Sequence, residues 1–202
     1  MPQIVLNTSE NIQYYIVPVF EDENIQTKIK SIANIIDFSN WPLLDDFKGS
    51  TKEYLLSASA NAKIYFVGLG KRQAPALVGK VLRSFFYNHR SKLKGNVAIC
   101  LQHDDFKGFE SDIANGIFLG NYRLGKQKTA ALPNHDWFAS DAKLVFLSEN
   151  TAINLLEHGK ELADTQIKIM TLVDAPANYK TPKMLADSIA AMGQESGFKV
   201  SI

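Results

Sequence analysis

The residues best suited to binding a charged ligand lie in a short glycine-containing loop. The run Gly68-Leu69-Gly70-Lys71-Arg72 follows a predicted strand and precedes a predicted helix. Backbone N–H groups at such a junction, with two cations beside them, could hold a phosphate at the helix N-terminus. The loop lacks the third glycine of a dinucleotide-binding fingerprint and the Gly-Lys-Ser/Thr ending of a P-loop. Glycines that serve only a tight turn are the favoured alternative, and the candidate anion loop consists of Gly68, Gly70, Lys71 and Arg72.

A second group of chemically capable side chains, Cys100 and His103-Asp104-Asp105, lies at the end of a predicted strand. A metal ion normally needs three or four ligands in a tetrahedral or octahedral array. Cys100 sits inside an apolar strand, where cysteine usually packs as a small hydrophobic residue. The remaining histidines have no partners at ligand or triad spacing: His89, His135 and His158. The spacing therefore predicts neither a metal site nor catalytic residues.

Positive charge is concentrated in one part of an otherwise balanced sequence. No acidic residue occurs between Glu53 and Asp104, although the formal net charge of the whole chain is only +1. Such an excess of cations could attract phosphates, including those of a nucleic acid. A solvated basic helix face is the favoured alternative. The basic residues of this stretch are Lys63, Lys71, Arg72, Lys80, Arg83, Arg90, Lys92 and Lys94.

The composition is that of an ordinary globular protein. Of the 202 residues, 46% are hydrophobic and 21% charged, close to the average for soluble domains. The single cysteine rules out an internal disulfide and fits a reducing compartment. We find neither a signal peptide nor an apolar run of about 20 residues that could span a bilayer. We therefore expect a cytoplasmic location and no membrane partner.

The hydrophobic pattern predicts the elements that would position these residues. Strands are expected over 3–6, 13–20, 53–58, 63–69, 96–101 and 143–147, and helices over about 25–36, 77–86, 109–122 and 151–163. From residue 63 onward strands and helices alternate, which indicates parallel strands with helices on the sheet faces. The pairing of the first strands is left open. Two glycines one turn apart, Gly116 and Gly120, suit close packing of the third helix.

The segment near the end of the chain, Leu172 to Pro182, is predicted to be a strand end, a stiff turn and the start of a helix. Pro176 disfavours helical backbone at Ala175. Thr181 is a good N-cap, and Pro182 fits the first helical position. The alternation of Phe198, Val200 and Ile202 is typical of a strand that needs a partner. We therefore expect the natural protein to continue beyond these residues.

Three stretches in this order resemble the leucyl (cytosol) aminopeptidase family. They are Val67-Gly68-Leu69-Gly70-Lys71, then 116–124 with Lys128-Thr129, then Pro176-Ala177-Asn178 with Thr181-Pro182 and Leu185-Ala186. The resemblance implies an α/β fold similar to macro domains, with three layers, a mixed and largely parallel sheet, and helices on both faces. It also implies two parts: an N-terminal macro-like domain over 1–150, then a connecting helix and the first segment of a catalytic domain over 151–202.

The resemblance implies a metallo-exopeptidase that uses two divalent metals, zinc or manganese, and assembles as a hexamer. The family's Asn-Thr-Asp-Ala-Glu-Gly-Arg and Lys-Gly-x-x-Phe-Asp-x-Gly-Gly motifs do not occur here, so no catalytic or metal residue is carried over. Asp174 and the 165–170 segment depart from the family pattern. We expect a non-catalytic domain that serves assembly and active-site access, with its own catalytic domain as partner. The alternative is a macro-like module that binds ADP-ribose, a nucleotide or nucleic acid through the 68–72 loop and the basic stretch.

Overall fold

A six-stranded sheet forms the centre of the protein in the computed structural model, which describes residues 1–8, 11–33, 36, 46–58, 62–72, 75–101, 106–123, 135–148 and 151–201. The strand order is β1-β6-β5-β2-β4-β3, and β3 is antiparallel to β4 while the other pairs are parallel. Each of the six strands predicted before residue 150 is present, with ends within about one residue of the prediction. The strands are β1 Gln3–Leu6, β2 Ile12–Phe20, β3 Tyr54–Ala58, β4 Lys63–Gly70, β5 Asn96–Cys100 and β6 Lys143–Leu147.

Strand β2 occupies the middle of the sheet, which answers the pairing question that the sequence leaves open. Its residue Tyr15 pairs with Ala98 of β5 on one side and with Ile64 of β4 on the other. β1 pairs with β6 at the far edge, with Ile4 opposite Leu144. The N-terminal strands are therefore integral to the sheet, and β2 separates two strands that are consecutive in the parallel series.

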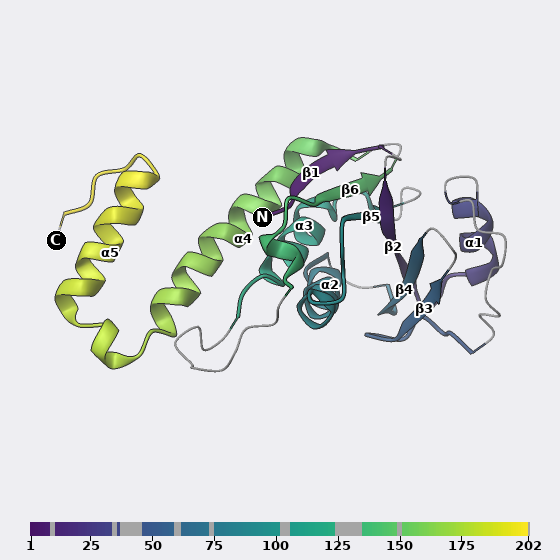
Figure 1. The fold of residues 1–202 in the computed structure, drawn as a ribbon, viewed down its shortest axis with the longest axis horizontal. Helices are drawn as coiled ribbons and strands as arrows, with labels where there is room; N and C mark the ends of the chain where they lie inside the picture. The colour runs from purple at the N-terminus through teal and green to yellow at the C-terminus, as the bar shows by residue number, and fades with distance from the viewer. Residues whose placement is uncertain are drawn as a thin grey trace.

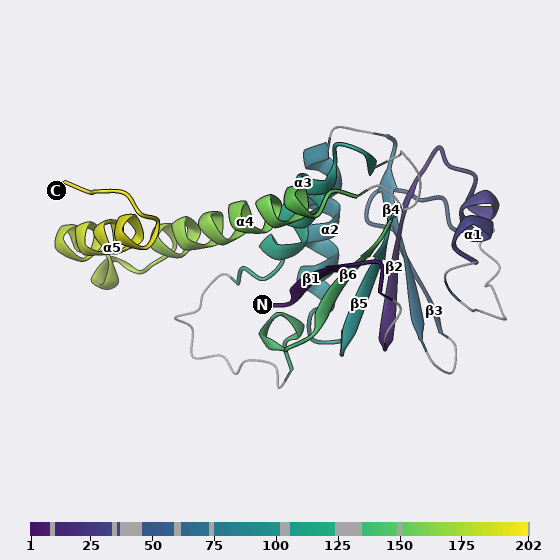
Figure 2. The ribbon, with the colours of Figure 1, turned by 90° about the horizontal axis from the view of Figure 1, so that it is seen from above.

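Helices cover both faces of this sheet (Figures 1 and 2). Helix α1 (Ile25–Ala33) lies on one face, whereas α2 (Pro75–His89) and α3 (Glu110–Leu119) lie on the other. Helix α4 (Ile153–Val173) packs against α3 and extends beyond the sheet. The predicted α/β class, mixed and largely parallel sheet, and helices on both faces are confirmed. The likeness to macro domains stays a prediction.

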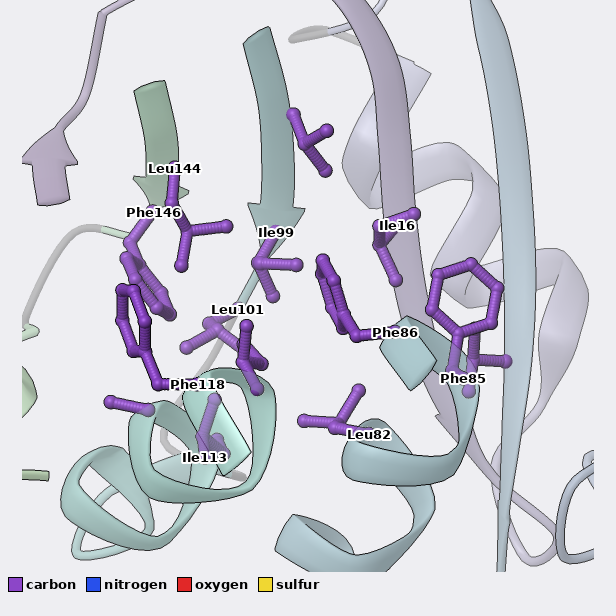
Figure 3. Close-up of a cluster of buried hydrophobic side chains, with 14 of the residues drawn as sticks. Ile16, Leu82, Phe85, Phe86, Ile99, Leu101, Ile113, Phe118, Leu144 and Phe146 are labelled. Atoms are coloured by element: carbon purple, nitrogen blue, oxygen red, sulfur yellow. The ribbon is translucent and has the colours of Figure 1, made fainter. Parts of the chain in front are cut away.

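Alternating side chains of the strands supply a hydrophobic core to each face. Ile16 and Ile99 point towards α2 and α3, where they meet Phe86 and other large side chains (Figure 3). Their neighbours Val17 and Ala98 point the opposite way, towards the isoleucines of α1. The short, nearly continuous apolar strands follow from this burial on both faces.

Glycines allow the helices α2, α3 and α4 to approach closely. A Cβ atom added at Gly116 of α3 would lie 2.1 Å from the carbonyl oxygen of Gly79 in α2. A Cβ atom at Gly159 of α4 would lie 2.2 Å from the carbonyl oxygen of Ser111 in α3. The predicted role of Gly116 in close backbone packing is confirmed. Gly120 is also close to α2, because its added Cβ would lie 3.0 Å from Cβ of Phe86.

The C-terminal part differs from the prediction in the length of its first helix. Helix α4 runs ten residues past the expected end at Ala163 and includes Leu172 and Val173, so the strand end expected there is wrong. The helix continues because Ile167 and Met170 extend the stripe that packs on the core. After a short 3-10 helix (η3, Ala177–Tyr179), Thr181 caps α5 (Pro182–Glu195) as predicted, its Oγ1 accepting a hydrogen bond from Met184 N at 3.3 Å.

The prediction of a strand from Phe198 onward is wrong, because residues 198–201 form no strand. Phe198 instead folds back onto α5: its N–H donates to the carbonyl of Gly193 at 2.9 Å. The missing Cβ of Gly193 leaves room for Val200. Ile202 lies outside the described residues, and the division of the chain at residue 150 stays a prediction. None of the helices in the described ranges is long and apolar enough to cross a membrane.

Candidate functional site

The glycines of the candidate anion loop make room for a neighbouring segment of the chain. A Cβ atom added at Gly68 would lie 2.1 Å from the carbonyl oxygen of Ser50. Gly70 has a φ of +76°, and an added Cβ there would lie 2.1 Å from Oγ1 of Thr51. Both positions therefore need glycine for packing and backbone conformation, whether or not the loop binds an anion.

The cations of the same loop differ in their surroundings. Lys71 is exposed, whereas Arg72 Nε lies 3.7 Å from Asp22 Oδ2 and its Nη2 lies 3.9 Å from Glu23 Oε1. The guanidinium also stacks over the ring of Phe20, 4.6 Å from its centroid. An anion at this loop would have to compete with two carboxylates for Arg72, and the anion-binding role stays a prediction.

The candidate metal-binding residues do not converge in the described structure. Cys100 is fully buried, and burial raises the pKa of its thiol to about 12, so the sulfur stays protonated. His103, Asp104 and Asp105 lie outside the described residues. Among the residues that are described, no three His, Cys, Asp or Glu side chains are placed to hold a metal ion. The described part of the chain therefore does not fit the two-metal site that the resemblance implies for a whole enzyme.

Two of the histidines have structural partners. His89 stacks on Phe85 with ring centroids 4.4 Å apart, and its Nδ1 donates to the Phe85 carbonyl at 2.9 Å. Burial lowers the pKa of His89, and the positive charge of Lys92 adds to that effect. The hydrogen bond to the carbonyl opposes it. His135 Nε2 lies 2.6 Å from the carbonyl oxygen of Leu93, and His158 is exposed on α4.

The basic stretch does not form one continuous patch. Lys63 begins β4, and Lys92 and Lys94 lie shortly before β5. Lys71 and Arg72 lie at the opposite end of the sheet, directly after β4. Lys80 and Arg83 lie on α2. Arg90 is buried in ion pairs. A nucleic-acid surface that uses all eight residues is therefore not present, and a role for part of the stretch stays a prediction.

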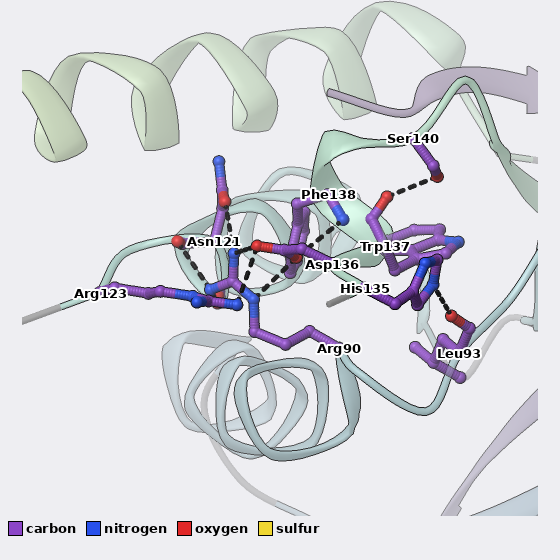
Figure 4. Close-up of polar contacts among 10 residues, drawn as sticks. Arg90, Leu93, Asn121, Arg123, His135, Asp136, Trp137, Phe138 and Ser140 are labelled. Carbon is purple, nitrogen blue, oxygen red and sulfur yellow. Dashed lines mark hydrogen bonds and ion pairs between the residues drawn. The ribbon is translucent and has the colours of Figure 1, made fainter. Parts of the chain in front are cut away.

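The buried residue Arg90 directly follows α2 and is the centre of a polar network at this end of the helix (Figure 4). Its Nε and Nη2 donate to the two carboxylate oxygens of Asp136, at 2.9 and 2.5 Å. Its Nη1 donates to the carbonyls of Gly120 at 3.1 Å and Asn121 at 2.8 Å. Arg123 also donates to Asp136, at 3.0 Å. The network ties the end of α2 to the end of α3 and to Asp136, which directly precedes Trp137.

Asp136 stays ionised within this network. Burial alone would raise its pKa, but the hydrogen bonds and charge of Arg90, with smaller contributions from the Phe138 N–H and Arg123, hold the pKa below its usual value. Asp136 also caps the 3-10 helix η2 (Trp137–Ala139), since its Oδ1 accepts from Phe138 N at 3.1 Å. Sequence reasoning missed this pair because its members are 46 residues apart, and only the capping position of Asp136 gives a local signal.

A surface hollow of about 370 Å³ lies beside the same helix ends. Its lining residues come from α2, from the segment after α3 and from α4, and all of them are polar or aromatic except the last: Arg83, Ser84, Tyr87, Asn88, Tyr122 and Met170. Arg83 belongs to the basic stretch identified in the sequence. The hollow itself could not be predicted from the sequence, because its lining residues come from three separate segments.

Tyr122 also joins the segment after α3 to the C-terminal end of α4. Its hydroxyl donates to Asp174 Oδ2 and lies 3.2 Å from the carbonyl oxygen of Met170. Burial raises the pKa of Tyr122 to about 12, and the hydrogen bond and negative charge of Asp174 add to the effect. The segment after α3 is thus fastened to the end of α4, directly before the turn that leads to α5.

Helix α4 exposes a second apolar stripe next to its buried one. Leu156, Gly159 and Ala163 are buried against the domain. Leu155, Leu162, Ile169 and Val173 are 39%, 42%, 49% and 64% exposed. Spacings of seven and four residues place these four on one face of the helix. Helix α5 adds three further exposed apolar residues: Met184, Leu185 and Ile189.

Comparison with known proteins finds no family model that matches, but it finds related sequences. The chain is 28% identical to a probable cytosol aminopeptidase of Aquifex aeolicus over 172 residues, covering 79% of this chain and 33% of the relative. It is 25% identical over 167 residues to the corresponding protein of Aromatoleum aromaticum, with coverage of 79% and 32%. A probable cytosol aminopeptidase of Rickettsia typhi is 34% identical over 95 residues. The chain thus spans about a third or less of the length of these relatives.

Solved structures show the same fold at low sequence identity. A mutant of tomato leucine aminopeptidase aligns with 98% of this chain and 43% of its own, at a TM-score of 0.74 and 16% identity. The bottromycin maturation enzyme BotP aligns with 92% of this chain and 38% of its own, at a TM-score of 0.66 and 16% identity. Taken together, the related sequences and the shared fold relate this chain to the N-terminal region of the leucyl (cytosol) aminopeptidase family.

Proposed function

We propose that this chain is the non-catalytic N-terminal domain of a leucyl aminopeptidase-like metallo-exopeptidase. The observation that carries the proposal is that 79% of this chain matches only 33% of the Aquifex aeolicus aminopeptidase. The family's metal-binding motifs do not occur in these 202 residues. The parent protein would remove N-terminal amino acids from peptides with two divalent metals, zinc or manganese, held outside this chain. One structural relative, BotP, is described in complex with Mn.

The exposed stripe of α4 supports a docking role for this domain. Leu155, Leu162 and Ile169 are exposed on α4. Another face of the same helix already packs against α3. Full burial of such a side chain contributes roughly 1.5–3 kcal/mol, so half-exposed residues still have about half of that to gain. We assign the catalytic part of the parent as the occupant of this stripe and of the apolar face of α5. The domain would thereby support assembly and restrict access to the active site.

Location and oligomeric state are further parts of the proposal. The relatives are named cytosol aminopeptidases, which supports a cytoplasmic location for the parent. A homo-oligomer, a hexamer in the full-length protein, is expected from the family resemblance. Light scattering of the full-length parent tests this, and a monomer at micromolar concentration would contradict it.

A chimera tests the docking role. This chain replaces the matched N-terminal third of the Aquifex aeolicus relative, and the product is assayed for assembly and for manganese-dependent hydrolysis of leucine p-nitroanilide. We expect an assembled, active chimera, and we expect Leu162→Gln with Ile169→Gln to weaken both properties. The matched control, Asn154→Gln with Glu161→Gln, changes two other exposed residues of α4 and should have no effect. A stripe variant that behaves like the control would overturn the docking assignment.

A further inference from the structure

Helix α2 presents a polar face that the packing of the domain does not use. Val78, Val81, Leu82, Phe85 and Phe86 form its buried face. The polar face is spaced at three and four residues, which places its members in one row along the helix. Four of its members line the hollow beside Tyr122 and Met170, and the row is Lys80, Arg83, Ser84, Tyr87 and Asn88.

The polar groups of this row have no partners within the described part of the chain. Arg83 makes no ion pair there, in contrast to Arg90 and Arg72. The hydroxyl groups of Ser84 and Tyr87 and the amide of Asn88 make no hydrogen bond with any described residue. A guanidinium, two hydroxyls and an amide thus face one hollow with their donors available.

The charge of the hollow is positive. Arg83 is among its lining residues and no carboxylate is, while Lys80 lies one turn before Arg83 on the exposed side of α2. The adjacent carboxylate of Asp174 accepts a hydrogen bond from Tyr122 and is not a lining residue. An arginine with free donors favours a carboxylate because it can form two parallel charge-assisted hydrogen bonds.

The rest of the hollow is suited to an apolar side chain. Met170 supplies a flexible thioether, and Tyr87 and Tyr122 supply ring surface. A volume of about 370 Å³ is at the small end of known ligand sites and suits one or two amino-acid side chains. Nucleic acid is a poorer match, because a backbone of phosphates needs a row of cations and only Lys80 and Arg83 are present here.

We propose that this hollow binds a peptide segment of a partner protein in which an acidic side chain is followed by an apolar one. The carboxylate binds Arg83 and accepts hydrogen bonds from Ser84 or Asn88. The apolar side chain packs on Met170 and on the ring of Tyr87. The site is formed by α2, Tyr122 and Met170 of α4. None of its lining residues belongs to the exposed stripe of α4, so the proposal does not depend on the docking role.

Nuclear magnetic resonance titration of the whole chain tests the proposal. The probe is an acetylated and amidated peptide, Gly-Asp-Leu-Phe-Gly, and its matched control has Asn in place of Asp. We expect shifts confined to residues of α2 and around Tyr122, a Kd between about 0.1 and 1 mM, and weaker binding at higher salt. The Asn peptide should bind at least about tenfold more weakly, because it loses a charge-assisted pair.

Variants of the chain complete the test. Arg83→Gln should weaken binding of the Asp peptide at least about tenfold, and Arg83→Lys should restore part of it. Lys94→Gln, an exposed change elsewhere on the domain, should leave it unchanged. The proposal is overturned by the absence of shifts at α2, by equal binding of the Asp and Asn peptides, or by an Arg83→Gln variant that binds normally. Equal binding of acetate alone would also overturn it, because the hollow would then be a simple anion site.

Discussion

Arg90 is a buried charged residue that joins the ends of α2 and α3. Its guanidinium is buried, and five hydrogen bonds join it to Asp136, Gly120 and Asn121. Its Cζ atom also lies 5.0 Å from the ring centroid of Phe138. A buried charge is tolerated only when it is paired in this way, so loss of either partner leaves an uncompensated group.

Replacing Arg90 with methionine should therefore be costly. We expect Arg90→Met to lower the free energy of unfolding by about 3 kcal/mol, the low end for a buried pair, because Asp136 keeps Arg123 and some solvent contact. Urea denaturation followed by circular dichroism measures this. The exposed control Lys94→Met should change stability by less than about 0.5 kcal/mol, and an equal effect of both variants would contradict the role of the network.

His89 should make stability depend on pH in a predictable direction. Its pKa is lowered in the folded state, so the unfolded chain binds a proton more readily. The stability is fully present above the unfolded pKa of about 6.5 and is lost as the pH falls through the lower folded pKa. Urea midpoints measured between pH 7.5 and 5 should fall. His89→Gln should reduce that slope, and His158→Gln, an exposed histidine, should not; identical slopes in all three proteins would refute this origin.

At the scale of elements, the helices α2, α3 and α4 stack through small residues. Gly79, Gly116 and Gly159 each face backbone atoms of the next helix, where a side chain would collide. In an open helix, replacement of glycine by alanine stabilises by up to about 1 kcal/mol. The sign of the effect therefore distinguishes a packing glycine from a glycine that is present for other reasons.

We expect Gly116→Ala to destabilise the protein by about 1–3 kcal/mol, since the new Cβ would lie 2.1 Å from the carbonyl oxygen of Gly79. Thermal and urea unfolding measure the change, and Ser84→Ala on the exposed side of α2 serves as the control. A Gly116→Ala variant that is more stable than the parent would show that the helices are not in close contact.

The strands were predictable from sequence because their signal is local. The apolar runs at 96–100 and 143–147 are short, continuous and buried on both faces, a pattern that indicates central strands. The length of α4 could not be predicted from the sequence, because the last ten residues of this helix are mostly exposed. Only Ile167 and Met170 continue the stripe that packs on the core. The alternation at Phe198 and Val200 gave a strand signal, but these residues pack on Gly193 of α5 instead.

The candidate sites were less predictable than the fold. The Gly68 and Gly70 motif was visible, yet its closest contacts are with residues 50 and 51, which the sequence could not bring beside it. The hollow on α2 and the pair of Arg90 and Asp136 combine residues from distant segments, so they required the sheet topology and the helix packing. Only side chains that share one element, such as Arg83 and Tyr87, could have been grouped from their spacing.

At the scale of the whole molecule, the sheet and the helices on its faces form a well-packed domain, whereas the end of α4 and α5 are largely exposed. Figure 1 shows α4 extending away from the sheet towards α5. An ion pair between Lys168 and Glu195 at 2.7 Å links the two helices. We propose that the catalytic part of the parent protein covers these exposed helix surfaces.

We propose that this chain is the non-catalytic part of a peptidase and hydrolyses no peptide by itself. The direct measurement is hydrolysis of leucine p-nitroanilide by the purified chain with manganese or zinc, beside a complete leucine aminopeptidase as positive control. We expect p-nitroaniline to be released no faster than in a sample without protein. Saturable hydrolysis that co-purifies with the chain and is abolished by a chelator would contradict it.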